Sequence, residues 1–533
     1  MKSRLSIVAT LIAALVLTLS ARPADDRVNE AMVTRIKMEA FQQSRVMDTL
    51  AELTDVYGAR LRGSPAYAAA ADWARQRLSD WGLAKVTFEP GGFPGPGWQV
   101  RRFSVEMTQP AYVRVIAQPL AWSPGTNGRV SGTPVLVEVS APADFEKYRG
   151  KLKGAIVMNG RPRTGAATSF VPAATRFTDE ELARGSAAID PTQKVLDNYD
   201  GPDYAGAELA RRQGLAPRAA VARFFRDEGV AAVLVASPLS SGVIRATDAG
   251  GFDLSGPNWK IPNPDLAPPS FVLGREDYGR IARLVERKRP VTVELQLDAE
   301  IIRQVKSVNI IAELPGSDAK LADELVMLGG HFDSWHTGTG ATDNAAGSAV
   351  MMEALRILKA IGATPRRTIR LALWDAEEGG HIGSTTYVLN HFADPRTMAL
   401  KPEHAKLAGY FNLDNGTGKI RGVFLQGNEA VRPIFEQWLK PFASLGATAL
   451  AVQRVGGTDH LDFDHVGLPA FQFVQDPIDY ETRTHHTNQD VLESIQEPDL
   501  QQAAAIVATF VYHAAMRDEK LPRAPLPKPP SAR

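Results

Sequence analysis

The feature that most restricts the fold of this chain is an alternation of strand-like and helix-like segments after Val305. Short apolar runs rich in β-branched residues predict strands, and the stretches between them place apolar residues at helical spacing. The predicted strands are 307–314, 324–330, 367–374, 408–414, 422–427 and 469–474, and the predicted helices are 344–361, 384–390, 433–445 and 498–516. This alternation predicts an α/β fold, with a mostly parallel central sheet and helices on both of its faces.

The first 300 residues have a different texture. Residues 28–85 show helical spacing, interrupted by a loop with Gly and Pro at 58–65, and residues 87–125 have no clear period. Residues 129–302 contain short β-branched runs bounded by turn residues, which predicts an inserted β-rich module with helices at 205–214 and 276–288. The predicted organisation is a signal peptide (1–21), the N-terminal part of the main domain (22–128), the insert (129–302), the catalytic part (303–520) and a Pro-rich disordered tail (521–533).

The N-terminus has the pattern of a secretory signal peptide. Lys2 and Arg4 precede an apolar run from Leu5 to Leu19, and Ser20 and Ala21 supply the small residues of a cleavage site. A membrane anchor is the alternative, but a bilayer span needs about twenty apolar residues and this run is shorter. We therefore expect cleavage after Ala21, export to the periplasm or the extracellular space, and no stable membrane association afterwards.

Charge and cysteine content exclude several kinds of chemistry. Sixty basic residues balance sixty acidic residues, so no global charge favours binding to nucleic acid. The chain has no cysteine, which excludes disulfides, thiolate catalysis and cysteine metal ligands. Any metal ion must therefore be held by His, Asp and Glu. The oligomeric state stays open, with a homodimer among the candidates.

All ten histidines occur from His331 onward, in a little under two fifths of the chain, which indicates a local chemical demand. Active groups of open α/β sheets collect at the carboxyl ends of strands. The candidate groups lie at such ends, or at the start of a helix, and they are His331, Asp333, Asp343, Glu377, Glu378, Asp414 and His486.

Each of these residues has an ordinary explanation when taken alone. Asp343 is typical of a helix N-cap, and two adjacent glutamates are usually a solvated pair. Their conjunction is different, because several carboxylates brought together repel one another unless a cation neutralises them. A mixture of imidazole and carboxylate ligands favours zinc first, with manganese or cobalt as alternatives.

Five motifs in this order resemble those of the co-catalytic zinc exopeptidases, the family of the bacterial leucine aminopeptidases and of carboxypeptidase Q. They are GGHFDSW, TDNAAG, WDAEEGGHIGS, NLD and HHTNQD. The resemblance is strongest over residues 305–515, and the 130–300 module resembles a protease-associated domain. By this resemblance two zinc ions are expected, with the first held by His331, Asp343 and Asp414, the second held by Asp343, Glu378 and His486, and Glu377 acting as the general base.

The resemblance also implies supporting residues. Asp333 is expected to hold the imidazole of His331, and Asp490 is expected to support His486, for which His485 is the competitor. Tyr480 is a candidate donor to the substrate or to the oxyanion, by analogy only.

The implied function is hydrolysis of short unblocked peptides, with dipeptides favoured. The residues that would bind a free peptide terminus stay open, and the candidates are Asp462, Asp464, Asp479, Glu481, Arg454 and Arg483. A catalytically inactive receptor or binding protein of the same fold is disfavoured because all five ligands and the base are present. A single-zinc glutaminyl cyclase is the other alternative, and metal stoichiometry with a cyclisation assay separates it. The chain has neither an H-E-x-x-H motif nor a G-x-S-x-G elbow.

Overall fold

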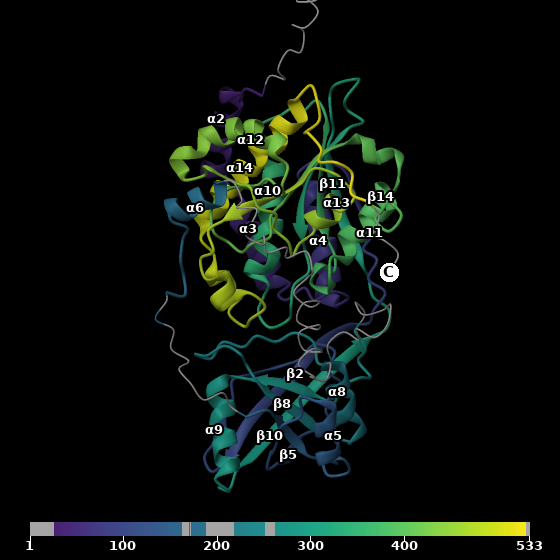
Figure 1. Ribbon diagram of the computed structural model, residues 1–533, viewed down its shortest axis with the longest axis vertical. Helices are drawn as coiled ribbons and strands as arrows, with labels where there is room; N and C mark the ends of the chain where they lie inside the picture. The colour runs from purple at the N-terminus through teal and green to yellow at the C-terminus, as the bar shows by residue number, and fades with distance from the viewer. Residues whose placement is uncertain (1–25, 162–169, 171, 188–217, 251–261, 529–533) are drawn as a thin grey trace, which may run out of the picture.

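The computed structural model describes residues 26–161, 170, 172–187, 218–250 and 262–528. The predicted signal peptide and the predicted helix at 205–214 lie outside these residues. Figure 1 shows a larger upper part, which holds most of the helices, and a smaller lower part. Within the described ranges, no helix has the length and apolarity needed to cross a membrane.

An eight-stranded sheet forms the centre of the larger part. Its middle strands β13, β12, β16 and β19 are parallel to one another, and antiparallel pairs occur toward both edges. In sheet order the strands are β1 (Ala84–Pro90), β11 (Val308–Leu314), β13 (Thr368–Trp374), β12 (Leu325–His331), β16 (Leu407–Asn412), β19 (Ala470–Gln475), β17 (Ile420–Phe424) and β18 (Ala449–Ala451).

Helices cover both faces of this sheet because side chains alternate between the faces along each strand. On β12, Val326 and Leu328 face one core, and Leu325 and Met327 face the other. The first core is covered by α2 (Glu30–Gln42), α3 (Val46–Ala51), α4 (Pro65–Asp80), α10 (Ala346–Ala360), α12 (Arg432–Leu439) and α14 (Glu497–Met516), and the second by α11 (Ile382–His391) and α13 (His460–Asp464). The predicted α/β fold with helices on both faces is confirmed.

The smaller part contains two further sheets (Figure 1). One has the order β4-β9-β8-β7-β6, and the other has the order β3-β2-β10-β5. The strands are β2 (Gly97–Gln109), β3 (Val113–Arg114), β4 (Ala117–Pro119), β5 (Val130–Gly132), β6 (Val135–Val137), β7 (Ile156–Asn159), β8 (Ala232–Ala236), β9 (Ser270–Leu273) and β10 (Thr292–Ile302), with helices α5 (Pro142–Tyr148), α8 (Arg218–Asp227) and α9 (Arg275–Glu286). The domain boundaries themselves stay a prediction.

The long strand β2 was not apparent from the sequence. Its residues do not alternate regularly between buried and exposed, so the period of two that reveals a strand is missing. Its pairing partner is β10, which follows almost two hundred residues later and pairs with β2 from end to end. This distant partner, rather than local pattern, makes the segment a strand.

Two segments differ from the organisation predicted from the sequence. Helix α6 (Asp179–Ser186) belongs by sequence to the predicted insert, yet it packs on β18 of the larger part (Figure 1). The predicted disorder from residue 521 is wrong for the start of the tail. Leu521 is buried and its N–H donates to the carbonyl of Ala408, and Arg523 donates to the carbonyl of Leu407 at 2.8 Å.

Candidate metal centre

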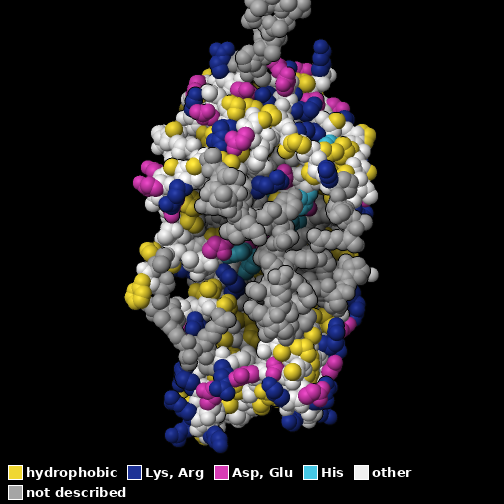
Figure 2. All heavy atoms as spheres, in the orientation of Figure 1, with side chains coloured by type: hydrophobic (Ala, Val, Ile, Leu, Met, Phe, Trp, Pro, Cys, Tyr) yellow, Lys and Arg dark blue, Asp and Glu magenta, His cyan; other side chains and the backbone are white. Residues whose placement is uncertain are grey.

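The predicted site residues meet at the carboxyl ends of parallel strands. His331 is the last residue of β12, Glu377 and Glu378 follow β13, and Asp414 follows β16. Because these strands run parallel, their carboxyl ends lie at one edge of the sheet. The space-filling view shows histidine side chains in the middle of the visible face, where the larger part meets the smaller (Figure 2).

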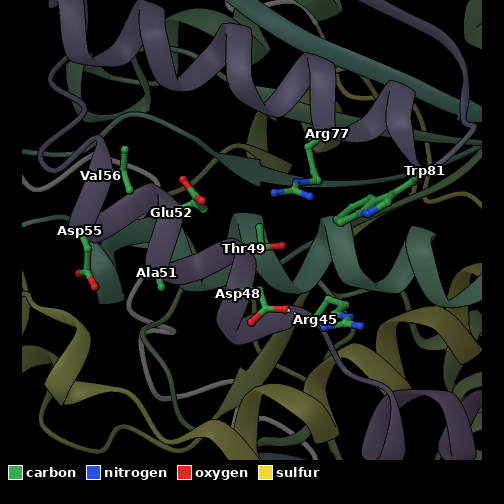
Figure 3. A pocket seen from close by; sticks show the side chains of 9 residues that line it. All are labelled: Arg45, Asp48, Thr49, Ala51, Glu52, Asp55, Val56, Arg77 and Trp81. Atoms are coloured by element: carbon green, nitrogen blue, oxygen red, sulfur yellow. Dashed lines mark hydrogen bonds and ion pairs between the residues drawn. The ribbon is translucent and has the colours of Figure 1, made fainter.

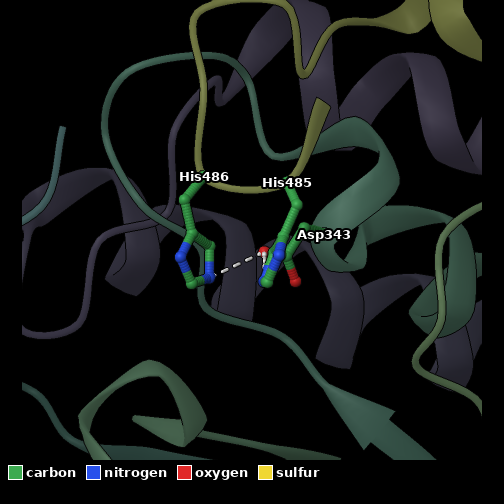
Figure 4. A group of neighbouring side chains, drawn as sticks. All are labelled: Asp343, His485 and His486. Carbon is green, nitrogen blue, oxygen red and sulfur yellow. Dashed lines mark ion pairs between the residues drawn. The ribbon is translucent and has the colours of Figure 1, made fainter. Parts of the chain in front are cut away.

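Asp343 lies between two histidines. It belongs to the turn η2 (Ala341–Ala345), which immediately precedes α10, and its own backbone is not helical (φ −134°). Its Oδ1 atom lies 3.2 Å from Nε2 of His331. Its Oδ2 atom lies 3.2 Å from Nε2 of His486, the contact drawn in Figure 4. The two oxygens of one carboxylate therefore face two separate imidazoles.

Each imidazole has a second carboxylate beside it. Nε2 of His331 lies 3.3 Å from Oδ1 of Asp414, and Nε2 of His486 lies 3.0 Å from Oε2 of Glu378. The neighbouring His485 is farther away, with its Nε2 atom 3.9 Å from Asp343. The geometry thus favours His486 over His485 and forms two clusters that share Asp343.

The spacing of these donor atoms fits zinc. Zinc bonds of about 2.0–2.2 Å in tetrahedral geometry separate neighbouring ligand atoms by about 3.3–3.6 Å. The histidine–carboxylate donor pairs in the two clusters are 3.0–3.3 Å apart, at the short end of this range or just below it, and all five side chains are largely shielded from solvent. Within the described part of the chain, Oε1 of Glu378 is buried without a hydrogen-bond partner. Buried oxygens of this kind are suited to a cation.

The protein alone carries an unfavourable concentration of charge here. Burial, together with the negative charge of Asp343, raises the pKa of Glu378 to about 8. Burial opposes protonation of His331, but the charges of Asp414 and Glu377 raise its pKa well above the ordinary value. A bound cation would replace these protons as the neutralising charge.

Two supporting residues act differently from the prediction. Nδ1 of His331 lies 2.9 Å from the backbone carbonyl of Asp333, whereas the carboxylate of Asp333 is 3.6 Å away and accepts the N–H of Glu377 at 3.0 Å. The carboxylate of Asp490 accepts the N–H of Thr342 at 2.5 Å. Asp490 therefore supports the turn that carries Asp343. The prediction that its carboxylate supports His486 was wrong, because that carboxylate contacts Thr342 instead.

Tyr480 lies beside the second cluster. Its ring stacks on that of His485 at a centroid distance of 4.7 Å, and Gly416, at φ +76°, leaves room for it, since a Cβ there would lie 3.0 Å from the ring. Burial and then the charge of Asp343 raise the pKa of Tyr480 well above 10. The hydroxyl is consequently a stable proton donor at neutral pH.

Arg60 is a structural residue that the sequence did not reveal. Its side chain is fully buried and donates to the carbonyls of Phe332, Thr339 and Gly340 at 2.8–3.0 Å. These carbonyls lie at both ends of the loop between His331 and η2. The N-terminal segment thereby stabilises the loop that spaces the two clusters.

His381 is a second residue without a predicted role. Its Nε2 atom lies 3.3 Å from Oε1 of Glu377, and its Nδ1 atom lies 3.8 Å from Asp462. It occurs in the motif WDAEEGGHIGS, in which the sequence predicted roles only for the two adjacent glutamates.

A pocket of about 690 Å³ lies elsewhere, against α3, α4 and the turn η1 (Glu52–Val56) (Figure 3). Its lining includes Arg45, Asp48, Glu52, Arg77 and Trp81, and none of the predicted site residues lines it. Since it contains neither a histidine nor a buried carboxylate cluster, we assign the chemistry to the strand-end site.

Imidazoles and carboxylates that converge on one edge of a parallel sheet, with a shared carboxylate, define a metallohydrolase of the α/β class. Comparison with known proteins identifies the family. Residues 309–511 match the model of peptidase family M28. The predicted resemblance to the zinc exopeptidases and the prediction of an enzyme are confirmed.

Known proteins resemble the chain well beyond these residues. Carboxypeptidase Q of Bos taurus and that of Homo sapiens are each 27% identical to it over 484 residues, which cover 90% of this chain and 87% of the relative. Aminopeptidase YwaD of Bacillus subtilis (strain 168) is 30% identical over 233 residues, 43% of this chain and 49% of the relative.

Solved structures show the same relationship. A peptidase M28 precursor from Shewanella amazonensis SB2B has a TM-score of 0.65 and 25% identity, and the match covers 94% of this chain and 99% of that one. BSAP, a zinc aminopeptidase from Bacillus subtilis, has a TM-score of 0.55 and 20% identity, with 90% and 98% covered. The second likeness concerns the fold alone.

Proposed function

We propose that the chain is a two-zinc exopeptidase that hydrolyses short unblocked peptides and favours dipeptides. The observation that carries the proposal is the position of Asp343, whose two carboxylate oxygens each lie 3.2 Å from a different imidazole. A carboxylate in this position can bind two cations at once. Manganese or cobalt could replace zinc with the same ligands.

The ligands divide between the two ions as the clusters do. His331 and Asp414 would hold the first ion, Glu378 and His486 would hold the second, and Asp343 would bridge them. When bound, the ions would supply a Lewis acid for the scissile carbonyl and would lower the pKa of a water molecule toward neutrality.

Glu377 is the proposed general base. A carboxylate oxygen of Glu377 lies within 4.8 Å of ligand atoms of His331 and Asp414, so it faces the first cluster without completing the second. Glu377 takes a proton from the attacking water and returns it to the leaving amine. Tyr480, which stays protonated, donates a hydrogen bond to the oxygen on which negative charge develops.

Some relatives are named carboxypeptidases and others aminopeptidases, so their names specify opposite ends of a peptide. Those named carboxypeptidase Q match 90% of this chain, and the Bacillus subtilis aminopeptidase matches 43%. The longer match supports a substrate class like that of the former, and it does not by itself select one terminus. We therefore propose activity on peptides with both termini free.

A metal analysis with a dipeptide panel tests the function. About two zinc ions per chain are expected, and a chelator should abolish hydrolysis of a free dipeptide. Cleavage of an acetylated dipeptide, with loss of activity on the dipeptide amide, would indicate a carboxypeptidase, and the opposite pattern an aminopeptidase. Efficient cleavage of a peptide with both termini blocked would refute the proposal that the chain is an exopeptidase. One zinc per chain with cyclisation of an N-terminal glutamine would identify a glutaminyl cyclase instead.

We also propose export with removal of residues 1–21, on the basis of the apolar N-terminal run. N-terminal sequencing of protein recovered from outside the cytoplasm should begin at Arg22. A chain that retains Met1 in the membrane fraction would contradict this proposal.

A further inference from the structure

The second histidine ligand lies on a loop that two segments of the predicted insert contact from two sides. We call residues 476–490 the His486 loop; it contains the π-helical turn η7 (Tyr480–Thr484) and ends at Asp490. The segments that contact it, 173–177 and 242–245, both belong by sequence to the predicted insert.

On the first side, the segment with Thr175 forms a β-bridge with Ile478. The N–H of Thr175 donates to the carbonyl of Ile478 at 2.8 Å, and the hydroxyl of Thr482 donates to the carbonyl of Ala173 at 2.6 Å. One backbone hydrogen bond and one side-chain hydroxyl therefore join the beginning of the His486 loop to the insert.

On the second side, Asn488 pairs with the backbone of Ile244. The N–H of Asn488 donates to the carbonyl of Ile244 at 3.0 Å, and the side-chain oxygen of Asn488 accepts the N–H of Ile244 at 2.7 Å. The side-chain amide also donates to the carbonyl of Gly242 at 3.2 Å. Three hydrogen bonds thus hold the residue two positions after His486.

The side chain of Arg245 bonds to the backbone next to the metal ligand His486. Its Nε atom donates to the carbonyl of His485 and its Nη2 atom to the carbonyl of Glu481, each at 3.2 Å. Carbonyls at the end of a helical turn lack partners within the turn, and a guanidinium can satisfy two of them at once. Arg245 also forms a β-bridge with Thr487, so it contacts the chain on both sides of His486.

His486 needs such support because its backbone is in the left-handed region, at φ +60°. A residue with a Cβ atom rarely adopts this conformation, and it persists where the surroundings hold it. The contacts from Arg245 and Ile244 lie within two residues of His486, so they are placed to hold this conformation.

We propose that Arg245 and Asn488 are positioning residues for the second metal ion, and that the insert sets the affinity of this ion by holding the His486 loop. The inference rests on the proposed function, because His486 is a ligand only in a two-metal site. It assigns the insert a role in assembling the site. The first ion, at His331 and Asp414, should be independent of these contacts.

Stepwise zinc affinities, measured by competition with a chromophoric chelator, test this inference. In Arg245→Ala and Asn488→Ala one of the two binding steps should lose about 10- to 100-fold in affinity, the usual effect of removing groups that orient a ligand. The other step should stay within about twofold of wild type, and excess zinc should restore dipeptide turnover. Arg245→Lys, which keeps the charge but not the two-pronged geometry, should fall between Arg245→Ala and wild type.

Arg129→Ala is the matched control, because Arg129 pairs with Glu294 on the surface of the insert at 2.9 Å, away from the His486 loop. It should bind both ions as the wild type does. Unchanged zinc affinities in Arg245→Ala would overturn the inference and leave the two-metal enzyme intact. Loss of both ions with a larger fall in Tm than in Arg129→Ala would also overturn it, because Arg245 would then act on the fold. A wild type that binds one ion would instead refute the proposed function.

Discussion

The imidazole of His381 lies 3.3 Å from the carboxylate of Glu377, the proposed general base. Although burial opposes a charge on His381, its contact with Glu377 raises the pKa of His381 to about 9. Asp462 lies on the other side of the ring at 3.8 Å, and the hydroxyl of Ser384 contacts Asp462 at 2.7 Å. A cationic imidazole therefore lies between the base and the partly buried carboxylate of Asp462, and it orients the carboxylate of Glu377.

Replacing His381 should slow turnover without releasing metal. His381→Asn is the suitable variant because His381 has φ +57°, a conformation that Asn tolerates. Loss of a charge-assisted hydrogen bond worth about 1.5 kcal/mol should lower kcat about tenfold. Steady-state kinetics and metal analysis check this, with KM and zinc content expected to stay near wild type. Unchanged kcat, or loss of zinc, would show that His381 does not position Glu377.

The adjacent glutamates should respond differently to the same substitution. Glu377→Gln should keep both ions and lose about 10²–10⁴-fold in kcat, the usual scale of general acid–base catalysis. Glu378→Gln should weaken binding of one ion, because its carboxylate lies 3.0 Å from His486. Each variant is the control for the other in parallel kinetics and metal analysis. The reverse pattern would mean that the two roles are exchanged.

Removing the shared carboxylate should disturb both metal sites. In Asp343→Ala each histidine loses an oxygen at 3.2 Å, so both zinc affinities should fall. Asp414→Ala is the comparison, since Asp414 contacts only His331 among the two ligand histidines and should affect one site. Metal content after dialysis measures both variants. Two fully occupied sites in Asp343→Ala would exclude the bridging role.

His391 should make part of the stability depend on pH. Its ring nitrogens lie 2.8 Å from Glu89 and 2.9 Å from Glu403, and the hydrogen bond to Glu89 raises the pKa of His391 despite burial. A raised pKa in the folded state stabilises the protein below the unfolded pKa of about 6.5, and this contribution is lost as pH rises through the folded pKa.

His391→Gln should therefore lower the free energy of unfolding by about 1 kcal/mol at pH 6, allowing for partial exposure of the pair, and by less at pH 9. Urea unfolding of wild type and variant at both pH values measures the difference. An equal loss at pH 6 and pH 9 would show that the protonated ring contributes nothing.

Local pattern was sufficient for the regular elements of the larger part. The predicted helices at 344–361 and 498–516 correspond to α10 and α14, and the strand predicted at 324–330 corresponds to β12 within one residue at either end. These segments carry their own period of apolar residues and pack on both sides against the core. Neighbouring parallel strands place their carboxyl ends at the same edge of the sheet. The imidazoles and carboxylates that follow these strands in the sequence were therefore predicted to be metal ligands.

The contacts around the site depended on tertiary structure. The sequence determined which metal-binding groups are present, namely imidazoles and carboxylates but no thiols. It also determined the order in which these groups follow the strands along the chain. Tertiary structure decided that the backbone carbonyl of Asp333 lies nearer to Nδ1 of His331 than its carboxylate does, and that Asp490 supports the turn that carries Asp343. It also brought Arg245 to the His486 loop across some 240 residues. Hydrogen bonds over such separations leave no periodic trace in the sequence, because each depends on where two distant segments meet after folding.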